Sequence, residues 1–186
     1  VGCGSIGQRH ICNLKALGVP QILAVDPAPN SLERATQLGA NAYGSLAAAL
    51  ADEPEAAIVS TPPGMHLAAA RATLETGSRL LIEKPIAASL DGVDAILDLA
   101  ARRESVLCVG YNLRFHSGLR KVKALLQAGA IGRLLTLRAE FGQYLPDWRP
   151  GRDYRTLYNA RATEGGGIVL DASHEIDYAR WLAGEI

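Results

Sequence analysis

Short apolar runs alternate with segments of helical periodicity along residues 1–110. Apolar runs of this length predict buried strands, here at 21–25, 56–60, 79–83 and 106–109, with a shorter strand at 42–43. Between them, apolar residues recur every three or four positions, which predicts amphipathic helices. Strands without polar alternation are buried on both faces, so the pattern favours an α/β domain with a doubly wound parallel sheet.

Turn residues mark where these helices begin and end. Gly18 and Gly39 follow the last residues of helical patterns, as expected for glycine after a helix C-terminus. The segment Asn30-Ser31-Leu32-Glu33 has the residue order of a capping box, so we expect a helix to begin there. Another helix is expected from His66 to Glu75, after a proline- and glycine-rich turn.

The pattern changes after Gly110. Residues 134–142 alternate apolar and polar side chains, which predicts a half-exposed strand of a one-sided sheet. A helix over 117–128 is expected to bury Leu119, Val122, Leu125 and Leu126. We therefore assign residues 1–112 to a first domain and residues 113–186 to the start of a second domain.

Composition and charge exclude several classes of protein. The chain has 19 basic and 19 acidic residues, so its net charge favours neither nucleic acid nor an anionic membrane surface. No apolar run approaches the roughly 20 residues of a membrane-spanning helix. The 3 cysteines form no CxxC pair, which is typical of a cytoplasmic protein. The histidine spacings give no HxH or HxxxH pair, so no metal is expected.

The segment Gly2-Cys3-Gly4-Ser5-Ile6-Gly7 has the glycine spacing of a dinucleotide-binding turn. In such a turn the first glycine bends the chain, the second admits a pyrophosphate, and the third lets the following helix approach the strand. The strand at 21–25 ends in Asp26, where a carboxylate accepts bonds from ribose hydroxyls and repels a 2′-phosphate. The alternatives are a tight turn without a ligand and a helix-capping aspartate. We therefore expect NAD to be bound in preference to NADP.

Both ends of the chain fall at unusual places in this pattern. Only Val1 precedes the glycine turn, although the strand that feeds such a turn is the central strand of its sheet. Residues 180–186 have the pattern of a helix end followed by the first residues of a strand. We expect the sequence to be an internal part of a longer protein.

Lys84 is the first candidate for proton transfer. The segment Glu83-Lys84-Pro85 ends a buried strand at the carboxyl edge of the predicted sheet, where open α/β sheets bind ligands. A lysine amine in such a crevice is a candidate proton donor or acceptor. The alternative is a lysine that has simply reached solvent.

Asp171, His174 and Tyr178 are expected on one face of a last helix that ends near Leu182. A histidine beside a carboxylate is a candidate general acid–base, and the alternative is charge pairing on a helix surface. His10 and His116 have no comparable partner in the pattern. His66 opens a helix and is expected to line or cap the cofactor crevice.

Residues 143–164 form a long polar loop that is rich in arginine. Arginine binds carboxylate and phosphate oxygens in pairs, and aromatic rings suit the apolar face of a sugar, so the loop suggests an anionic sugar. The alternative is that the arginines pair with Asp147, Asp153, Glu164 or a neighbouring subunit. The residues that would contact the substrate are Trp148, Arg149, Arg152 and Arg155, with Tyr154 interleaved.

Five segments in this order resemble one known family. GCGSIG, STPPGMH, EKP, GYNLRF and GGGIVLDASHEID are together similar to the Gfo/Idh/MocA family, that is, the glucose–fructose oxidoreductase and inositol dehydrogenase family. The resemblance implies a Rossmann domain followed by an α+β domain with an open-faced, mostly antiparallel sheet, which commonly forms the oligomer interface. It also implies NAD(P)-dependent chemistry on hydroxyl-bearing carbons of sugars and cyclitols.

The family roles can be transferred to matching positions of this chain. Lys84 and His174 resemble the catalytic lysine and histidine, and Asp171 resembles the acid that accompanies the histidine. Family members commonly separate that acid and histidine by four residues, whereas the spacing here is three, which puts the role of Asp171 in doubt. The residues that resemble the cofactor side are Thr61, Pro62, His66, Glu83 and Asn112, and those placed on the substrate side are Arg114 and Tyr178.

These observations predict an oxidoreductase that acts on a secondary alcohol of a sugar or sugar derivative. The segment 144–155 also resembles a subgroup associated with bacterial surface-sugar metabolism. Two alternatives remain, namely a nucleotide-binding regulatory protein without turnover and an NAD-recycling lyase or glycosidase of the same family. The expected partners are a sugar-like small molecule and further copies of the full-length chain, without nucleic acid or membrane.

Overall fold

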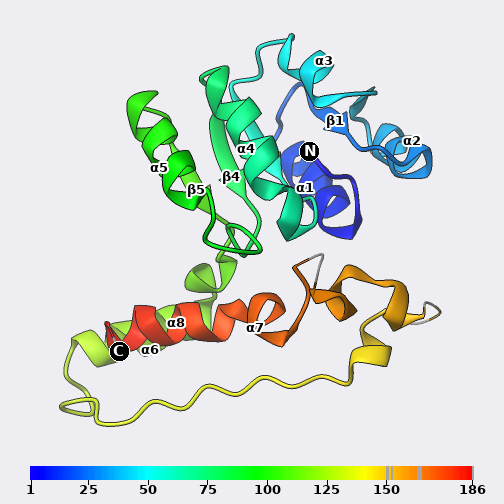
Figure 1. Ribbon diagram of the computed structural model, residues 1–186. Coiled ribbons are helices and arrows are strands. Elements are labelled where there is room, and N and C mark those ends of the chain that lie inside the picture. Colours follow the sequence, from blue (N-terminus) through cyan, green and yellow to red (C-terminus); the bar gives the residue numbers. More distant parts are fainter. Residues whose placement is uncertain (150, 152, 163–164, 186) are drawn as a thin grey trace. The chain divides into compact units, whose positions relative to one another are not determined.

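The computed structural model describes residues 1–149, 151, 153–162 and 165–185. The chain divides into two compact units, Val1–Gly110 and Tyr111–Ile186, and each is described by itself (Figure 1). No helix of the described residues is both long enough and apolar enough to cross a membrane.

The first unit alternates helices and strands, as predicted. All strand pairs are parallel, with β1 beside β2 and with β4 between β3 and β5. This arrangement confirms the α/β prediction for the first part of the chain. The elements in order are α1 (Ser5–Ala16), β1 (Leu23–Val25), α2 (Pro29–Gln37), β2 (Asn41–Tyr43), α3 (Leu46–Leu50), β3 (Ala56–Val59), α4 (His66–Glu75), β4 (Arg79–Ile82), α5 (Val93–Arg102) and β5 (Leu107–Val109).

Val1 and Gly2 lie between β1 and β3 and join the two groups of strands. The Val1 amine donates to the Ile58 carbonyl at 2.8 Å, and the Ser60 N–H donates to the Val1 carbonyl at 2.8 Å. On the other side, the Gly2 N–H donates to the Val25 carbonyl at 2.8 Å. These two residues therefore lie between β1 and β3, where the central strand of the sheet is expected to end. A cavity of about 900 Å³ adjoins them, lined in part by Ile11, Leu14, Ile22, Ala24, Ile58 and Leu81.

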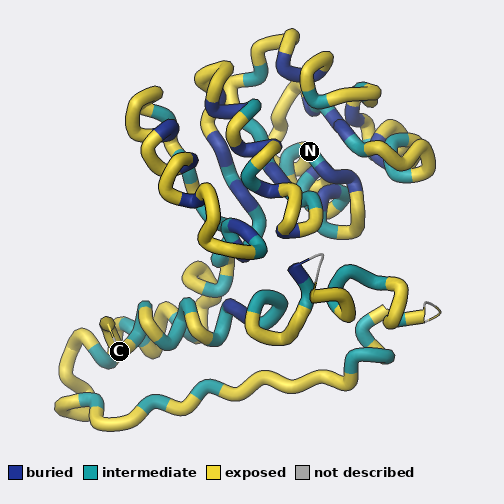
Figure 2. Tube along the Cα trace, in the orientation of Figure 1, coloured by how far each residue is buried: buried dark blue, intermediate teal, exposed yellow. Residues whose placement is uncertain are grey.

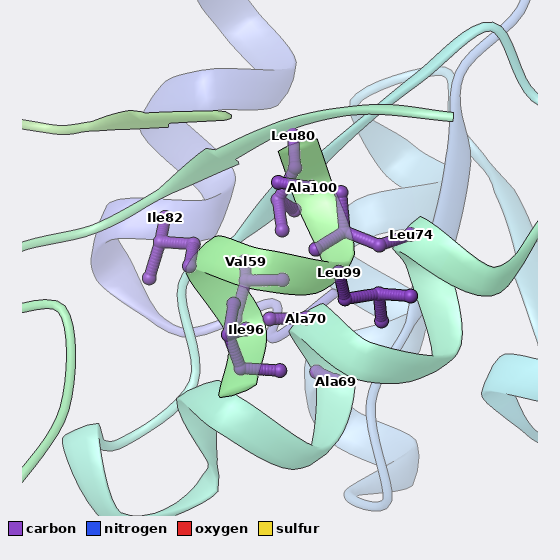
Figure 3. Packing of buried hydrophobic residues seen from close by; sticks show 9 residues of the cluster. All are labelled: Val59, Ala69, Ala70, Leu74, Leu80, Ile82, Ile96, Leu99 and Ala100. Carbon is purple, nitrogen blue, oxygen red and sulfur yellow. The ribbon is translucent and has the colours of Figure 1, made fainter. Parts of the chain in front are cut away.

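Two clusters of small aliphatic side chains form the core of the first unit. One fills the space between the sheet and helices α4 and α5, where Leu74 and Ile82 are fully buried (Figure 3). The other joins α1 and α2 to β1 around Ile11 and Ala35. Neither cluster contains an aromatic side chain. The buried positions follow the strands and the inward faces of the helices (Figure 2).

Helix α2 begins earlier than the capping-box pattern predicts, so the prediction of a start at Asn30-Ser31 is wrong. Pro29 occupies the first turn, and Ala28 is the N-cap residue. Proline suits this position because its fixed φ is helical and it lacks an N–H that would have no partner. The Asp26 carboxylate accepts the Ala28 N–H at 2.8 Å, which satisfies a donor ahead of the first turn.

The second unit consists of helices and short turns. Helix α6 packs against α8 and η2, but no residue of α6 is fully buried, and Val122 and Leu125 remain 42% and 43% exposed. The expectation that α6 buries its apolar face is therefore wrong for this arrangement. The elements are η2 (Asn112–Phe115), α6 (Ser117–Gln127), η3 (Leu145–Trp148), η4 (Tyr154–Thr156), η5 (Tyr158–Ala160), α7 (Ile168–Asp171) and α8 (Ser173–Ala183).

Residues 134–144 are extended but form no β-ladder, so the paired strand predicted at 134–142 is not observed (yellow trace in Figure 1). A strand needs a second backbone to receive its hydrogen bonds. No backbone hydrogen bond joins residues 134–143 to another part of the chain that the structure describes. Leu135 consequently remains 77% exposed. The open-faced sheet of the second domain stays a prediction.

The last helix is also interrupted. Ala172 has φ −100° and ψ 30°, which ends α7 at Asp171 before α8 begins at Ser173. The prediction of a single helix after the glycine run is therefore wrong. Asp171 and His174 lie in different helices, so spacing along one helix does not relate them.

Candidate functional site

The three glycines of the first turn differ in what a side chain at each position would contact. Gly2 has φ +85°, and a Cβ there would lie 2.7 Å from the Ser60 carbonyl group. A Cβ on Gly7 would lie 1.9 Å from the Gly2 carbonyl oxygen, so α1 approaches the turn too closely for any side chain. A Cβ on Gly4 meets no atom within 4 Å. The open space at the N-terminus of α1 fits a pyrophosphate, because helix N-termini attract anions.

Asp26 ties the end of β1 to this turn. Its Oδ2 accepts the Cys3 N–H at 2.7 Å, and its Oδ1 accepts the Ala28 N–H. The Cys3 side chain is buried, and burial raises the pKa of its thiol above the usual value. Cys3 therefore acts as a small buried side chain inside the turn, because a protonated thiol is a poor nucleophile.

Ser60 and Thr61 follow β3 at the same edge of the sheet. The Ser60 hydroxyl donates to the Gly2 carbonyl at 2.8 Å and holds the glycine turn against β3. The Thr61 Oγ1 is buried and has no hydrogen-bond partner among the described residues. A buried hydroxyl without a partner is costly, so this atom fits a polar ligand group.

His66 is buried, with backbone oxygens beside both ring nitrogens. Its ring is 1% exposed, with Nδ1 2.8 Å from the Pro85 carbonyl oxygen and Nε2 2.8 Å from the Thr61 carbonyl oxygen. The imidazole therefore joins the loop after β3 to the turn after β4. The ring does not face open solvent, because it is buried and both nitrogens face backbone atoms. That His66 caps the cofactor crevice stays a prediction.

Glu83 has a partner that the sequence pattern did not suggest. The His10 Nε2 lies 2.8 Å from the Glu83 Oε1, and the Lys84 N–H donates to Oε2 at 3.3 Å. Burial acts to raise the pKa of Glu83, but the hydrogen bond and charge of His10, together with Lys84, outweigh burial and lower the pKa. Glu83 is therefore held as an ionised carboxylate. The statement that His10 has no partner is wrong.

In the second unit, Arg114 contacts a carboxylate of its own chain. Its Nε donates to the Asp177 Oδ2 at 2.8 Å, and its Nη2 donates to Oδ1 at 2.6 Å. The hydrogen bonds with Asp177 raise the pKa of Arg114, while partial burial opposes them. This bidentate pair connects η2 to α8, so Arg114 supports α8, whereas we had expected it to face the substrate.

His174 lies near the start of α8. The Tyr111 ring meets it edge-on, with ring centroids 5.7 Å apart and planes at 82°. Tyr178 follows one turn later in the same helix, as predicted, and burial raises the pKa of its hydroxyl. Asn112 lies in η2 and is exposed. The histidine is thus packed against η2 within its own unit.

Asp171 belongs to a separate hydrogen-bonded group. Its carboxylate accepts the Tyr158 hydroxyl at 3.2 Å and the Asn159 side-chain amide at 2.6 Å. Burial, followed by the charge of Asp171, raises the pKa of Tyr158 to about 12. A Cβ on Gly166 would lie 2.0 Å from the Tyr158 carbonyl oxygen, so this glycine is required for packing. Sequence analysis missed both η5 partners, because nothing in their local pattern distinguishes them.

The arginine-rich loop is described only in part, since Arg152 and Glu164 lie outside the described residues. Arg155 Nε donates to the Asp153 Oδ1 at 3.0 Å, which lowers the pKa of Asp153. Arg155 thus follows the alternative in which the arginines pair with nearby carboxylates. Trp148 packs edge-on against Phe141, with centroids 6.4 Å apart.

The first unit therefore gathers Gly2–Gly7, Asp26, Ser60–Pro62 and Glu83–Lys84 at the carboxyl ends of its parallel strands. Such edges bind ligands in open α/β sheets. Residues 1–111 match the protein family described as "Oxidoreductase family, NAD-binding Rossmann fold", and residues 119–186 match the "GFO/IDH/MocA C-terminal domain". The chain belongs to the Gfo/Idh/MocA family.

Several family members resemble the chain over nearly all of its length. The myo-inositol dehydrogenase Hyg17 of Streptomyces leeuwenhoekii is 32% identical over 99% of this chain and 54% of its own length. The solved structure of a levoglucosan dehydrogenase with NADH and levoglucosan is 27% identical with a TM-score of 0.84, covering 99% of this chain and 52% of that one. The chain spans about half the length of these relatives.

A third relative carries a charged ligand. The WlbA dehydrogenase from Chromobacterium violaceum, solved with NADH and UDP-GlcNAcA, is 26% identical with a TM-score of 0.83. The match covers 98% of this chain and 54% of the WlbA chain. The two solved structures thus hold different sugars, levoglucosan in one and UDP-GlcNAcA in the other.

A side chain at Gly4 would meet no protein atom, so a substitution there tests ligand binding separately from folding. Gly4→Ala in the full-length protein is expected to keep the unfolding midpoint, because its φ of −66° is allowed for alanine and the Cβ meets no protein atom. NADH affinity should fall by about 10-fold, or roughly 1.4 kcal/mol, since the new methyl group fills the proposed pyrophosphate space. Titration of NADH fluorescence measures the affinity.

Gly7→Ala is the matched comparison in the same turn. Its Cβ would overlap the Gly2 carbonyl oxygen, so it should cost about 3 kcal/mol or more of folding free energy. Unchanged NADH affinity in Gly4→Ala would show that the pyrophosphate lies elsewhere.

Proposed function

We propose that the protein is an NAD-dependent oxidoreductase that transfers hydride between nicotinamide and a secondary alcohol or ketone of a sugar or cyclitol. The observation that carries the proposal is the open space at Gly4, with Asp26, Thr61 and Lys84 following parallel strands at the same edge of the sheet. The dehydrogenase names and the NADH complexes of relatives support it.

The cofactor would be held by residues of the first unit. The N–H groups at the start of α1 would bind the pyrophosphate, and the Thr61 hydroxyl and the neighbouring Pro62 would face the cofactor. Asn112, at the start of the second unit, is proposed to contact the nicotinamide side. When bound, NAD supplies the hydride acceptor.

Asp26 is the proposed determinant of cofactor preference. Its carboxylate already accepts two backbone N–H groups, and an ionised carboxylate has about four acceptor positions. It can therefore accept ribose hydroxyls without releasing the glycine turn. A 2′-phosphate would meet its negative charge, so NAD is favoured over NADP.

Lys84 and His174 are the proposed proton-transfer groups. In the oxidative direction, one of them removes the hydroxyl proton while the hydrogen on the same carbon leaves as hydride. Asp171 would accept a hydrogen bond from a substrate hydroxyl, held in place by Tyr158 and Asn159. Tyr178, one turn from His174, would contact the substrate.

The domain assignment accompanies this proposal. We propose that residues 1–112 bind the dinucleotide and that residues 113–186 begin a substrate and oligomerisation domain. The division of the chain into units at Gly110 and Tyr111 and the two family matches support this boundary.

A charged sugar is the second candidate substrate class. Trp148 and Arg149 are the described residues of the loop that are proposed to contact it, and the UDP-GlcNAcA complex of WlbA supports the idea. Arg155 is a weaker candidate for this contact, because its Nε–H already donates to the Asp153 carboxylate. A role in bacterial surface-sugar metabolism would follow from a substrate of this kind.

Substitution of the proposed proton-transfer residues tests the reaction. With full-length protein, NAD and a panel of neutral sugars, cyclitols and nucleotide-linked sugar acids, absorbance at the NADH band should rise for one substrate class. Lys84→Ala and His174→Ala should each lower kcat on the order of 10²–10⁴-fold, while NADH affinity changes little.

Lys121→Ala and His116→Ala are matched controls, since both residues are exposed. Full activity in Lys84→Ala and His174→Ala would exclude the proposed roles. Turnover of substrate without net NADH would instead favour an NAD-recycling lyase or glycosidase, and tight NADH binding without turnover of any sugar would favour a regulatory protein.

Cofactor preference is tested at Asp26. The wild-type protein should bind NADH more tightly than NADPH by about 2 kcal/mol, or roughly 30-fold, since hydrogen bonds to charged groups contribute about 1.5–3 kcal/mol each. Asp26→Asn should reduce this ratio to within about 3-fold of unity, mainly by weakening NADH. Glu33→Gln removes one exposed negative charge from α2 as the control, and tighter binding of NADPH by the wild type would overturn the assignment.

A further inference from the structure

We propose that His10 is a positioning residue for Lys84, acting through the Glu83 carboxylate. The inference deepens the proposed function, on which it rests for the role of Lys84. His10 lies in α1, six residues after Gly4, and Glu83 lies at the end of β4. One hydrogen bond thus connects the helix of the proposed pyrophosphate cradle with the turn that carries the proposed catalytic amine.

The contact is short and partly shielded from water. Nε2 and Oε1 are 2.8 Å apart, and the side chains of His10 and Glu83 are 21% and 22% exposed. A carboxylate accepts the Nε2–H of a histidine whether or not the ring carries a charge. The bond therefore requires no particular charge state of the ring, which suits a structural connection within a site.

The Glu83 carboxylate is restrained from two further directions. Its Oε2 accepts the N–H of Lys84, so the carboxylate orients the peptide that leads to that residue. On the remaining side lies Gly110, where a Cβ would be 3.2 Å from Oε2 and 3.3 Å from the carboxyl carbon. Glycine at this position leaves just enough room for the carboxylate.

These restraints have a chemical purpose. Glu83 precedes Lys84 directly, so the orientation of its carboxylate sets both the peptide that leads to the lysine and the negative charge near the lysine amine. By fixing Oε1, His10 keeps the carboxylate directed at α1 and at the Lys84 backbone. A shift of α1 when its N-terminus binds a pyrophosphate would also reach Glu83 through this bond, and hence the Lys84 turn.

The test compares His10→Ala with His10→Gln in the full-length protein. Glutamine retains an N–H donor for Glu83, whereas alanine removes it. Asn13→Ala, an exposed position one turn further along α1, is the matched control. Reductive methylation with ¹³C-formaldehyde labels Lys84, and the signal missing from Lys84→Ala spectra identifies it.

His10→Ala should shift the Lys84 signal in nucleotide-free protein and alter its further response to NADH. His10→Gln and Asn13→Ala should both keep the wild-type signal and its response. In turnover, His10→Ala should lower kcat on the order of 10–100-fold, as expected for a small misplacement of a reacting group, with the KM for NAD within about 3-fold. His10→Gln should recover most of that loss.

A second variant displaces the carboxylate from the opposite side. Gly110→Ala leaves His10 intact but presses on Glu83, and it should also shift the Lys84 signal. This variant decides the question if His10→Ala does not fold. An unchanged Lys84 signal and NADH response in the folded variants would overturn the proposal. A shifted signal together with full activity of Lys84→Ala would instead refute the proposed catalytic role and leave the positioning contact in place.

Discussion

The close approach of α1 to the first two residues is the contact on which the remainder of the candidate site depends. Gly7 lies so near the Gly2 carbonyl that no side chain is tolerated, and Ser60 fixes that carbonyl from β3. This contact places the N-terminus of α1 at the carboxyl edge of the sheet. Because every strand of the first unit is parallel, Asp26, Thr61 and Glu83 reach the same edge. The site is thus a consequence of strand direction combined with one close backbone contact.

Much of the first unit could be predicted from the sequence because its signals are local. Buried parallel strands appear as apolar runs, and glycine is required wherever backbone atoms come closer than a Cβ allows. Asp26 could be found because it directly follows such a strand. The capping-box pattern at residues 30–33 predicts the start of α2 too late, because Pro29 is also a favoured residue for the first helical turn.

The errors at the site share a different cause. His10 and Glu83 are separated by 73 positions, and His66 reaches Pro85 across the loop that joins two strands. No periodicity encodes such pairs, because they arise only when strand ends are brought together. In the second unit, Asp171 was assigned to the face of His174 on the assumption of a continuous helix. The interruption at Ala172 and the bonds from Tyr158 and Asn159 depend on a loop whose conformation has no repeating pattern. The extended segment at 134–144 shows the same limit, since alternation predicts an extended chain but not the partner that completes a sheet.

The purely aliphatic cores of the first unit have a consequence for spectroscopy. Both tryptophans of the chain, Trp148 and Trp181, and both phenylalanines belong to the second unit, and Tyr43 is the single aromatic residue of Val1–Gly110. Intrinsic tryptophan emission of these residues therefore originates in the second unit, from α8 and from the loop before it. Unfolding of the first unit would be measured by far-ultraviolet circular dichroism or by the fluorescence of bound NADH. The distribution of aromatic residues thus gives the two units separate optical signals without any added label.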